Sequence, residues 1–332
     1  MPELAVVDRF DCAPTRVFHT LPASTAKPMS KLLTRIAKLV LRAFAAYPEA
    51  DYLPLDQITA ESAMRLARLA YADERESGCG LLKYFEGKVE LSGEMILDLG
   101  SGFGGRTVEF QRVTGGHYVG IEIDSRMAGA ALRFARSMGN DASFSTGVGE
   151  FLPFVDDSFD AVLCYDVLEH VHDPETTLAE VYRVLKPGGL FLTVFPPYFH
   201  PKGAHLDGYA SRLPYANALF PSRVLLSAID EILEERGDGY RPQALRPGDR
   251  LYGLNGITIR SFRRMLAKSH FEILRLEFLP LLNKMIRQYN AWKMGYYAWV
   301  FSPFSRVPFV RELLTHRIVA ALRKPPSIAA QK

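Results

Sequence analysis

The sequence lacks the features that mark several large classes of protein. It has three cysteines, at positions 12, 79 and 164, and their spacing indicates neither a metal site nor a disulfide framework. No apolar run reaches the length of about 18 residues that indicates a membrane-spanning helix. The first residues carry acids where a secretory signal would need a basic start. We therefore expect a protein of the reducing cytoplasm.

An excess of charge of either sign is also absent. The 332 residues include 40 Lys and Arg against 37 Asp and Glu, a formal net charge of +3, which does not favour a nucleic-acid partner. Hydrophobic residues make up 48% of the chain, which is ordinary for a globular protein with one large core. Composition therefore excludes several classes and leaves function to the motifs.

The middle of the chain alternates between strand and helix patterns. Helical spacing of apolar residues is found between the apolar runs, for example at 126–137 and 176–185. The strands that we predict are 95–99, 118–123, 143–145, 160–165, 190–195, 271–278 and 317–322. This alternation predicts an α/β fold with a doubly wound, seven-stranded, mostly parallel sheet.

The same patterns divide the chain into four parts. Two helical patterns precede the first strand, and a connection of about 60 residues between 197 and 257 is long enough to be functional. The parts that we predict are a helical N-terminal cap at 1–90, a cofactor-binding core at 91–200, an inserted acceptor-binding lid at 201–256, and a C-terminal part of the sheet at 257–332 with an aromatic-rich insertion at 279–314.

The segment "ILDLGSGFGGRT" follows the first strand pattern and carries a nucleotide-binding spacing. Gly100, Gly102 and Gly105 stand as G-x-G-x-x-G, and Glu122 follows about 20 residues later, where an acid can accept both ribose hydroxyls. Asp98 would repel a pyrophosphate at the mouth of this turn but suits a cationic ammonium group. S-adenosylmethionine has that ammonium group and a ribose, and it has no phosphate.

Four segments in order resemble the successive motifs of class-I S-adenosylmethionine-dependent methyltransferases. They are "ILDLGSGFG", "GIEID", "GEFLPFVDDSFDAVLCYDVLEHV" and "RVLKPGGLFLTVFPP", and they cover residues 95–197. The resemblance implies an enzyme with a Rossmann-like fold and S-adenosylmethionine as its cofactor. The site residues that it implies are Asp98, Gly100 and Gly102 around the methionine part, Glu122 at the ribose, Ile123 beside the adenine, Gly149 and Glu150 at the adenine edge, and Tyr165 on the far side of the pocket. The family often has an acid where this chain has Val148.

The segment "YDVLEHVHD" after the fourth strand holds the candidate catalytic residue. His170 follows the strand end nearest the methyl group, and an imidazole titrates near neutral pH, as a general base should. His170 and Glu169 are alternatively structural residues that brace the next helix. Asp166, Glu169 and His170 also match a metal-ligand arrangement of magnesium-dependent family members, which His200 or His205 would complete. Our prediction is a site without metal, whose activity chelators leave unchanged.

These features predict a methyltransferase whose acceptor is a small molecule that is apolar or lipid-linked. The atom that we expect to be methylated is an oxygen of this acceptor. The alternative is a non-catalytic subunit or scaffold that binds S-adenosylmethionine. The oligomeric state is left open.

Two segments carry cations beside apolar residues. Lys31, Arg35, Lys38 and Arg42 form a basic stripe on the first predicted helix, and 278–311 has aromatic rings and cations without an acid. Both segments fit a lid over the cofactor pocket. They also fit a lid that touches the inner face of a membrane, because such rings and cations suit the headgroup region.

Overall fold

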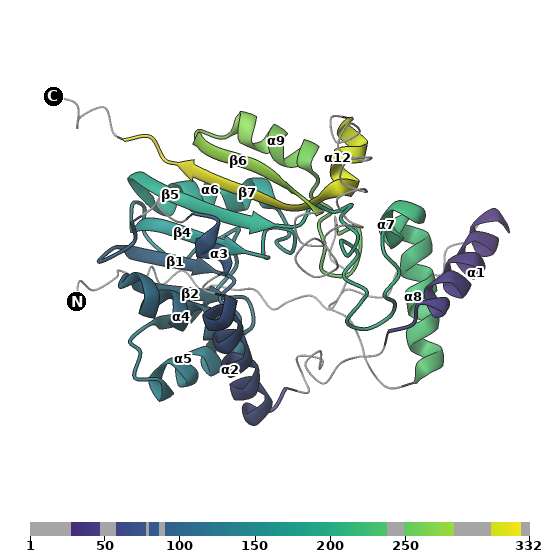
Figure 1. Cartoon of the computed structure of the whole chain (residues 1–332), viewed down its shortest axis with the longest axis horizontal. Helices are drawn as coiled ribbons and strands as arrows, with labels where there is room; N and C mark the ends of the chain where they lie inside the picture. Colours follow the sequence, from purple (N-terminus) through teal and green to yellow (C-terminus); the bar gives the residue numbers. More distant parts are fainter. Residues whose placement is uncertain are drawn as a thin grey trace, which may run out of the picture.

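The computed structural model describes residues 28–46, 58–77, 80–85, 90–237, 249–281 and 307–326. Figure 1 shows a twisted sheet with helices on both faces and a separate group of helices at one end. The predicted aromatic-rich insertion at 279–314 lies mostly outside the described residues. Within the described ranges, no helix combines the length and the apolar character needed to cross a bilayer.

The sheet has seven strands in the order β3-β2-β1-β4-β5-β7-β6. The first five strands pair in parallel, and β7 runs antiparallel to both of its neighbours, so the predicted mostly parallel sheet is confirmed. The strands are β1 (Met95–Leu99), β2 (His117–Glu122), β3 (Ser143–Thr146), β4 (Phe159–Tyr165), β5 (Leu185–Phe195), β6 (Glu272–Pro280) and β7 (Thr315–Arg323). The strand β5 begins five residues earlier than predicted, because the "KPGG" segment belongs to the strand.

The two faces of the sheet are buried against different helices. Leu97 and Val162 point to one face with Phe262 of α9, whereas Ile96 and Leu163 point to the other with residues such as Phe110 of α4. Successive residues of both strands are therefore buried, as expected for parallel strands covered on both sides. The helices around the sheet are α2 (Ala60–Ser77), α3 (Gly80–Lys83), α4 (Gly105–Thr114), α5 (Ser125–Ser137), α6 (Pro174–Val184), α9 (Ile259–Lys268) and α12 (Pro308–Leu314).

Two helices begin where their sequence supplies a cap. The Asp124 carboxylate accepts from two backbone N–H groups at the start of α5, and Asp173 does the same for α6, which has Pro174 in its first turn. Asp124 follows β2, and Asp173 follows the loop after β4. The two caps therefore determine where α5 and α6 begin, next to the edge of the sheet that carries the predicted site.

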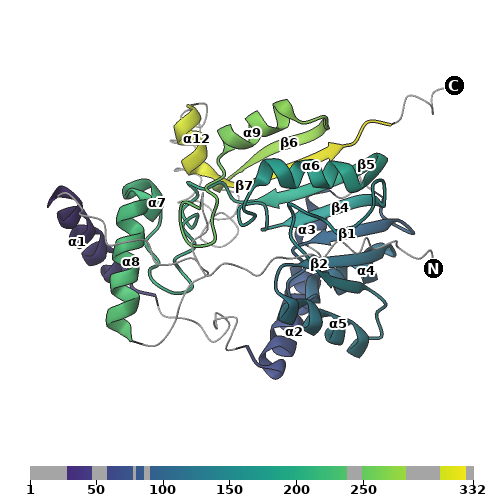
Figure 2. The same cartoon turned by 180° about the vertical axis from the view of Figure 1, so that it is seen from behind.

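A second hydrophobic cluster lies apart from the sheet. It joins α1 (Pro28–Ala43), α7 (Ala216–Leu219) and α8 (Ser222–Arg236), with Leu41 and Leu225 fully buried in it. Figures 1 and 2 show α1 beside α8, at the end of the molecule opposite the last residues of β7. By contrast, α2 packs on α4 and α5. The two helices of the predicted N-terminal cap therefore contribute to different places, α1 to the insertion and α2 to the core.

Candidate active site

The glycine turn joins β1 to α4 and is tied to the neighbouring strand. The backbone N–H groups of Gly100 and Ser101 both donate to the Ile121 carbonyl, at 2.9 and 3.0 Å. A Cβ at Gly100 would lie 2.2 Å from Val167, and its φ of +79° favours glycine. At Gly102 a Cβ would meet, among the described residues, one atom of Met127 at 3.8 Å. The backbone at Gly102 is therefore open to a ligand.

Glu122 ends β2 with its carboxylate against this turn. One carboxylate oxygen accepts from the N–H of Gly102 at 2.9 Å, and the other accepts from the N–H of Ile123 at 2.9 Å. Burial raises the pKa of Glu122, and these backbone N–H groups oppose the rise. The structure thus brings together the glycine turn and the acid that the spacing predicted for a ribose.

Asp98 lies buried near the end of β1, beneath the first turn of α4. Its carboxylate accepts from the Thr107 hydroxyl at 2.6 Å. Burial raises the pKa of Asp98 to about 6, although this hydrogen bond opposes the rise. A cation stabilises a buried carboxylate of this kind, which fits the prediction that Asp98 binds the ammonium group of the cofactor.

Two charged residues that sequence reasoning missed cover the other side of the turn. Arg106 donates to the Glu74 carboxylate of α2 at 2.6 Å, and its guanidinium lies 4.4 Å from the centre of the Tyr165 ring. Glu74 also accepts from the N–H of Gly80 at 2.8 Å, which ties α3 to the same place. The arginine stands directly after Gly105, so its position in the first helical turn was the available signal.

Apolar side chains lie exposed where β2 and β3 end. Ile123 is 54% exposed, and Val148 and Phe151 are 37% and 55% exposed. The two strand ends are adjacent because the N–H of Gly147 donates to the Glu122 carbonyl. These three residues offer an apolar surface for a flat ring beside the ribose position, and Phe151 was not predicted.

Gly149 and Glu150 lie nearer to α6. A Cβ at Gly149 would be 3.0 Å from Thr177, and the Glu150 carboxylate accepts from the backbone N–H groups of His172 and Asp173, at 2.5 and 2.9 Å. In the described structure Glu150 therefore braces the start of α6. The contact of both residues with adenine stays a prediction.

The segment after β4 carries a buried acid and an oriented imidazole. Glu169 is 4% exposed, and neither of its carboxylate oxygens has a hydrogen-bond partner within the described part of the chain. Burial raises the pKa of Glu169 well above its usual range. His170 Nδ1 donates to the Gly253 carbonyl at 2.8 Å, which leaves Nε2 as the basic atom, 3.9 Å from the Glu169 carboxylate.

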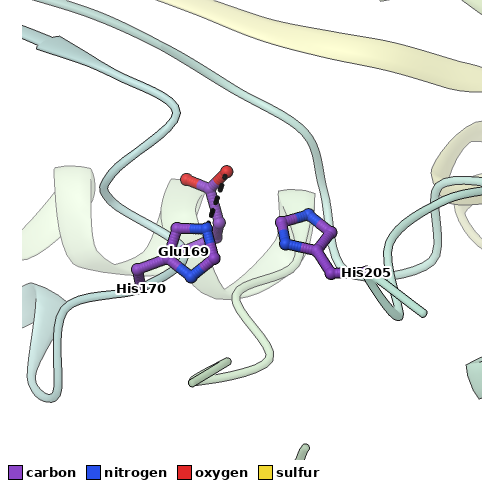
Figure 3. A group of neighbouring side chains, drawn as sticks. All are labelled: Glu169, His170 and His205. Atoms are coloured by element: carbon purple, nitrogen blue, oxygen red, sulfur yellow. Dashed lines mark ion pairs between the residues drawn. The ribbon is translucent and has the colours of Figure 1, made fainter. Parts of the chain in front are cut away.

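The insertion contributes His205 to this group, as Figure 3 shows. One donor atom from each of Glu169, His170 and His205 lies within 4.8 Å of the others. Burial and the neighbouring His170 lower the pKa of His205 to about 3, so its imidazole is neutral. Asp166, which the sequence also suggested as a metal ligand, instead accepts a hydrogen bond from Arg317 of β7. His200, the alternative to His205 in that prediction, contacts His316 at 3.0 Å.

A cavity opens beside these side chains, between the end of β4, the insertion and the start of β7. Most of its lining residues are polar or charged, and two of them, Lys202 and Arg317, are cations. The other polar lining residues are Asp166, Glu169, His200, His205, Asp207 and His316. An acceptor in this cavity would lie at the carboxyl edge of the sheet, beside the segment that follows β4.

Comparison with known families agrees with this geometry. Residues 97–193 match the family model described as "Methyltransferase domain". This segment is a class-I S-adenosylmethionine-dependent methyltransferase domain. The match contains Asp98, the glycine turn, Glu122 and His170, so it covers the predicted cofactor site and ends before the insertion.

Curated relatives resemble the chain over the same region. The sterol 24-C-methyltransferase of Gibberella zeae is 38% identical over 101 residues, which are 30% of this chain and 27% of that protein. The ubiquinone/menaquinone biosynthesis C-methyltransferase of Vibrio vulnificus is 33% identical over 156 residues, 45% of this chain and 55% of that protein. The chain thus spans about half or less of the length of these relatives.

A solved structure of geranyl diphosphate methyltransferase in complex with SAM is also similar. Its sequence identity is 18% and its TM-score is 0.47, and the alignment covers 84% of this chain and 96% of that one.

Glu122→Ala tests the ribose position. We expect S-adenosylmethionine to bind about 10-fold or more weakly, because a charged hydrogen-bond acceptor contributes on the order of 1.5–3 kcal/mol. Titration calorimetry measures the affinity. Glu175→Ala is the control, because it removes the same charge from an exposed residue that pairs with Lys268. An unchanged affinity in Glu122→Ala would mean that the ribose binds elsewhere.

The raised pKa of Asp98 predicts a pH dependence of cofactor binding. Below about pH 6 the buried carboxyl is protonated and neutral, so S-adenosylmethionine should bind more weakly as the pH falls through 6. The expected loss approaches about tenfold for each pH unit below 6. Asp98→Asn should lose most of this dependence in calorimetry between pH 5 and 8. An equally steep profile in that variant would assign the titration to another group.

Proposed function

We propose that the protein transfers the methyl group of S-adenosylmethionine to an oxygen atom of a small, hydroxylated acceptor whose remainder is apolar or lipid-linked. The observation that carries this proposal is the orientation of His170, whose Nδ1 donates to the Gly253 carbonyl and whose neighbours Glu169 and His205 line the cavity. A peripheral contact with the inner face of a membrane would bring a lipid-linked acceptor to this cavity, and we propose that contact separately from the methyl transfer.

The residues around the glycine turn fit the cofactor. Asp98 suits the ammonium group and Glu122 the ribose hydroxyls, while Ile123 offers an apolar surface to the adenine. The Arg106 guanidinium beside Tyr165 suits the carboxylate of the methionine part. When bound, S-adenosylmethionine supplies an electrophilic methyl group on a sulfonium centre. In-line orientation of the acceptor then contributes most of the acceleration, roughly 7–11 kcal/mol in favourable cases.

A hydroxyl acceptor must also lose its proton. His170 Nε2 is the basic atom of that imidazole, and it faces Glu169 at 3.9 Å. After proton transfer the imidazolium would lie beside this carboxyl group, and its positive charge would favour ionisation of Glu169, whose pKa burial otherwise raises. The cations Lys202 and Arg317 in the cavity lining would favour the deprotonated acceptor in the same way.

Methylation on carbon is a second candidate. Both curated relatives described above are named C-methyltransferases. Removal of a proton from a ring hydroxyl increases electron density on the neighbouring ring carbon, so the same base serves both reactions. The position of the methyl group in the product distinguishes the two candidates.

Turnover with a labelled cofactor tests the proposed function. We expect that a cell extract incubated with the protein and methyl-labelled S-adenosylmethionine yields S-adenosylhomocysteine and one methylated small molecule. Mass spectrometry identifies the product, and its NMR spectrum shows a methyl group on oxygen or on carbon. Cofactor binding without S-adenosylhomocysteine formation in any extract would support the alternative of a non-catalytic subunit.

His170→Gln tests the general base. We expect kcat to fall by about 10²–10⁴-fold with cofactor affinity unchanged, because general-base catalysis contributes this much. The rate should recover at high pH, where the acceptor ionises in solution. Val113→Gln, a change of an exposed residue on α4, is the control.

The same assay tests whether Glu169, His170 and His205 bind a metal. The Arg317 guanidinium, which pairs with Asp166 beside this group, disfavours a further cation, so we expect EDTA to leave turnover unchanged. Loss of turnover in EDTA with recovery in a divalent metal would contradict this expectation.

A further inference from the structure

Helix α1 presents three different faces. Thr34, Ala37 and Leu41 are buried, and the latter two belong to the hydrophobic cluster with α8. Beside this buried face runs the basic stripe of Lys31, Arg35, Lys38 and Arg42. Residues four and three apart share a face of a helix, so the stripe is continuous along it.

The third face is apolar and exposed. Leu32, Ile36 and Leu39 recur at four and three residues and are 60%, 42% and 67% exposed. Leu33 and Phe44 extend this face and are 39% and 48% exposed. We call these five exposed residues, on α1 and directly after it, the outer face of α1. Isolated apolar residues on a surface need no explanation, but a continuous stripe along one helix indicates an interaction.

The charges beside the outer face are of one sign. Within Pro28–Ala43 there is no acidic residue. The acids of α8 that lie nearest, Glu231 and Glu235, are paired with Lys38 at 2.8 and 2.5 Å, and Arg42 also pairs with Glu235. These two acids are thus paired with cations where α1 meets α8, and Lys31 and Arg35 are exposed at the N-terminal half of the helix.

We propose that the outer face of α1 binds an anionic lipid surface. An apolar stripe flanked by cations is the pattern of a helix that lies in the headgroup region, with its apolar side chains toward the acyl chains and its cations near lipid phosphates. Figures 1 and 2 show α1 at the outer edge of the molecule, with α8 between it and the sheet. A flat surface can therefore approach α1 without meeting the sheet.

This contact has a consequence for the acceptor cavity. The cluster that fixes α1 to α8 also contains Ala204 and Leu206, the neighbours of His205. Lipid binding by α1 would thereby hold the insertion, and the cavity that it lines, near the membrane surface. This consequence rests on the proposed function, whereas the lipid contact itself does not.

Co-sedimentation with vesicles tests the proposal. The full-length protein should bind vesicles of phosphatidylglycerol and phosphatidylcholine at low salt, and about tenfold more weakly to phosphatidylcholine alone or at high salt. Leu32→Ser/Ile36→Ser/Leu39→Ser should lose binding at least tenfold. Lys31→Glu/Arg35→Glu should remove the preference for anionic lipid. Lys38 and Arg42 are left unchanged because they pair with α8.

The matched control places three serines on other exposed apolar residues. Leu69→Ser/Val113→Ser/Met138→Ser should bind vesicles like the unchanged protein, because these residues are 47%, 52% and 45% exposed on other helices or at their ends. Calorimetry with S-adenosylmethionine checks that every variant is folded. No binding to anionic vesicles, or full binding by the α1 serine variant, would overturn the proposal. A dimer that this variant abolishes, without vesicle binding, would assign the outer face to a second copy.

Methyl transfer and lipid binding are measured separately. Turnover without vesicle binding would remove the lipid contact and leave the proposed function standing. Vesicle binding without turnover on any acceptor would contradict the proposed function and leave the lipid contact standing.

Discussion

The parallel pairing of β1 between β2 and β4 is the constraint on which the rest of the site depends. It brings the carboxyl ends of the three strands to one edge of the sheet, and the predicted site residues lie at or directly after these strand ends. The glycine turn, Glu122 and the segment from Asp166 to His170 meet there, although they are far apart in the sequence. The hydrogen bonds from Gly100 and Ser101 to β2 fix the turn in this position.

Burial of acidic side chains at this edge lowers the stability of the folded protein, and a bound ligand can offset this loss. Burial raises the pKa values of Asp98, Glu122 and Glu169, which means that the folded protein disfavours their charged forms. A positively charged ligand would relieve this cost at Asp98, and hydroxyl groups that donate hydrogen bonds would relieve it at Glu122. Arg106 and Arg317, whose guanidinium groups both lie near the Tyr165 ring, keep the site from being uniformly negative. The charges at this edge suit the predicted cofactor, which carries both an ammonium and a carboxylate group.

The insertion and α1 act together as a second unit beside this edge. Their shared hydrophobic cluster is separate from the clusters of the sheet, so the position of His205 depends on packing that the core does not provide. This division agrees with the extent of the methyltransferase domain match, which ends at residue 193. The predicted cofactor residues therefore lie inside the matched segment, and the insertion that holds His205 lies outside it.

Local patterns in the sequence predicted the strands, most helices and the glycine turn with Glu122, because these features depend on neighbouring residues and on the fixed periods of helix and strand. The partners of charged side chains could not be read in this way. Asp166 pairs with Arg317, Lys38 with Glu231, and His205 joins Glu169 and His170, across separations that only packing decides. Arg106 was missed for the same reason, since α2 determines its surroundings. The sequence by itself determined the α/β core and its cofactor; the tertiary structure decided which polar groups are paired, because burial makes each unpaired group costly and pairing depends on distance in space.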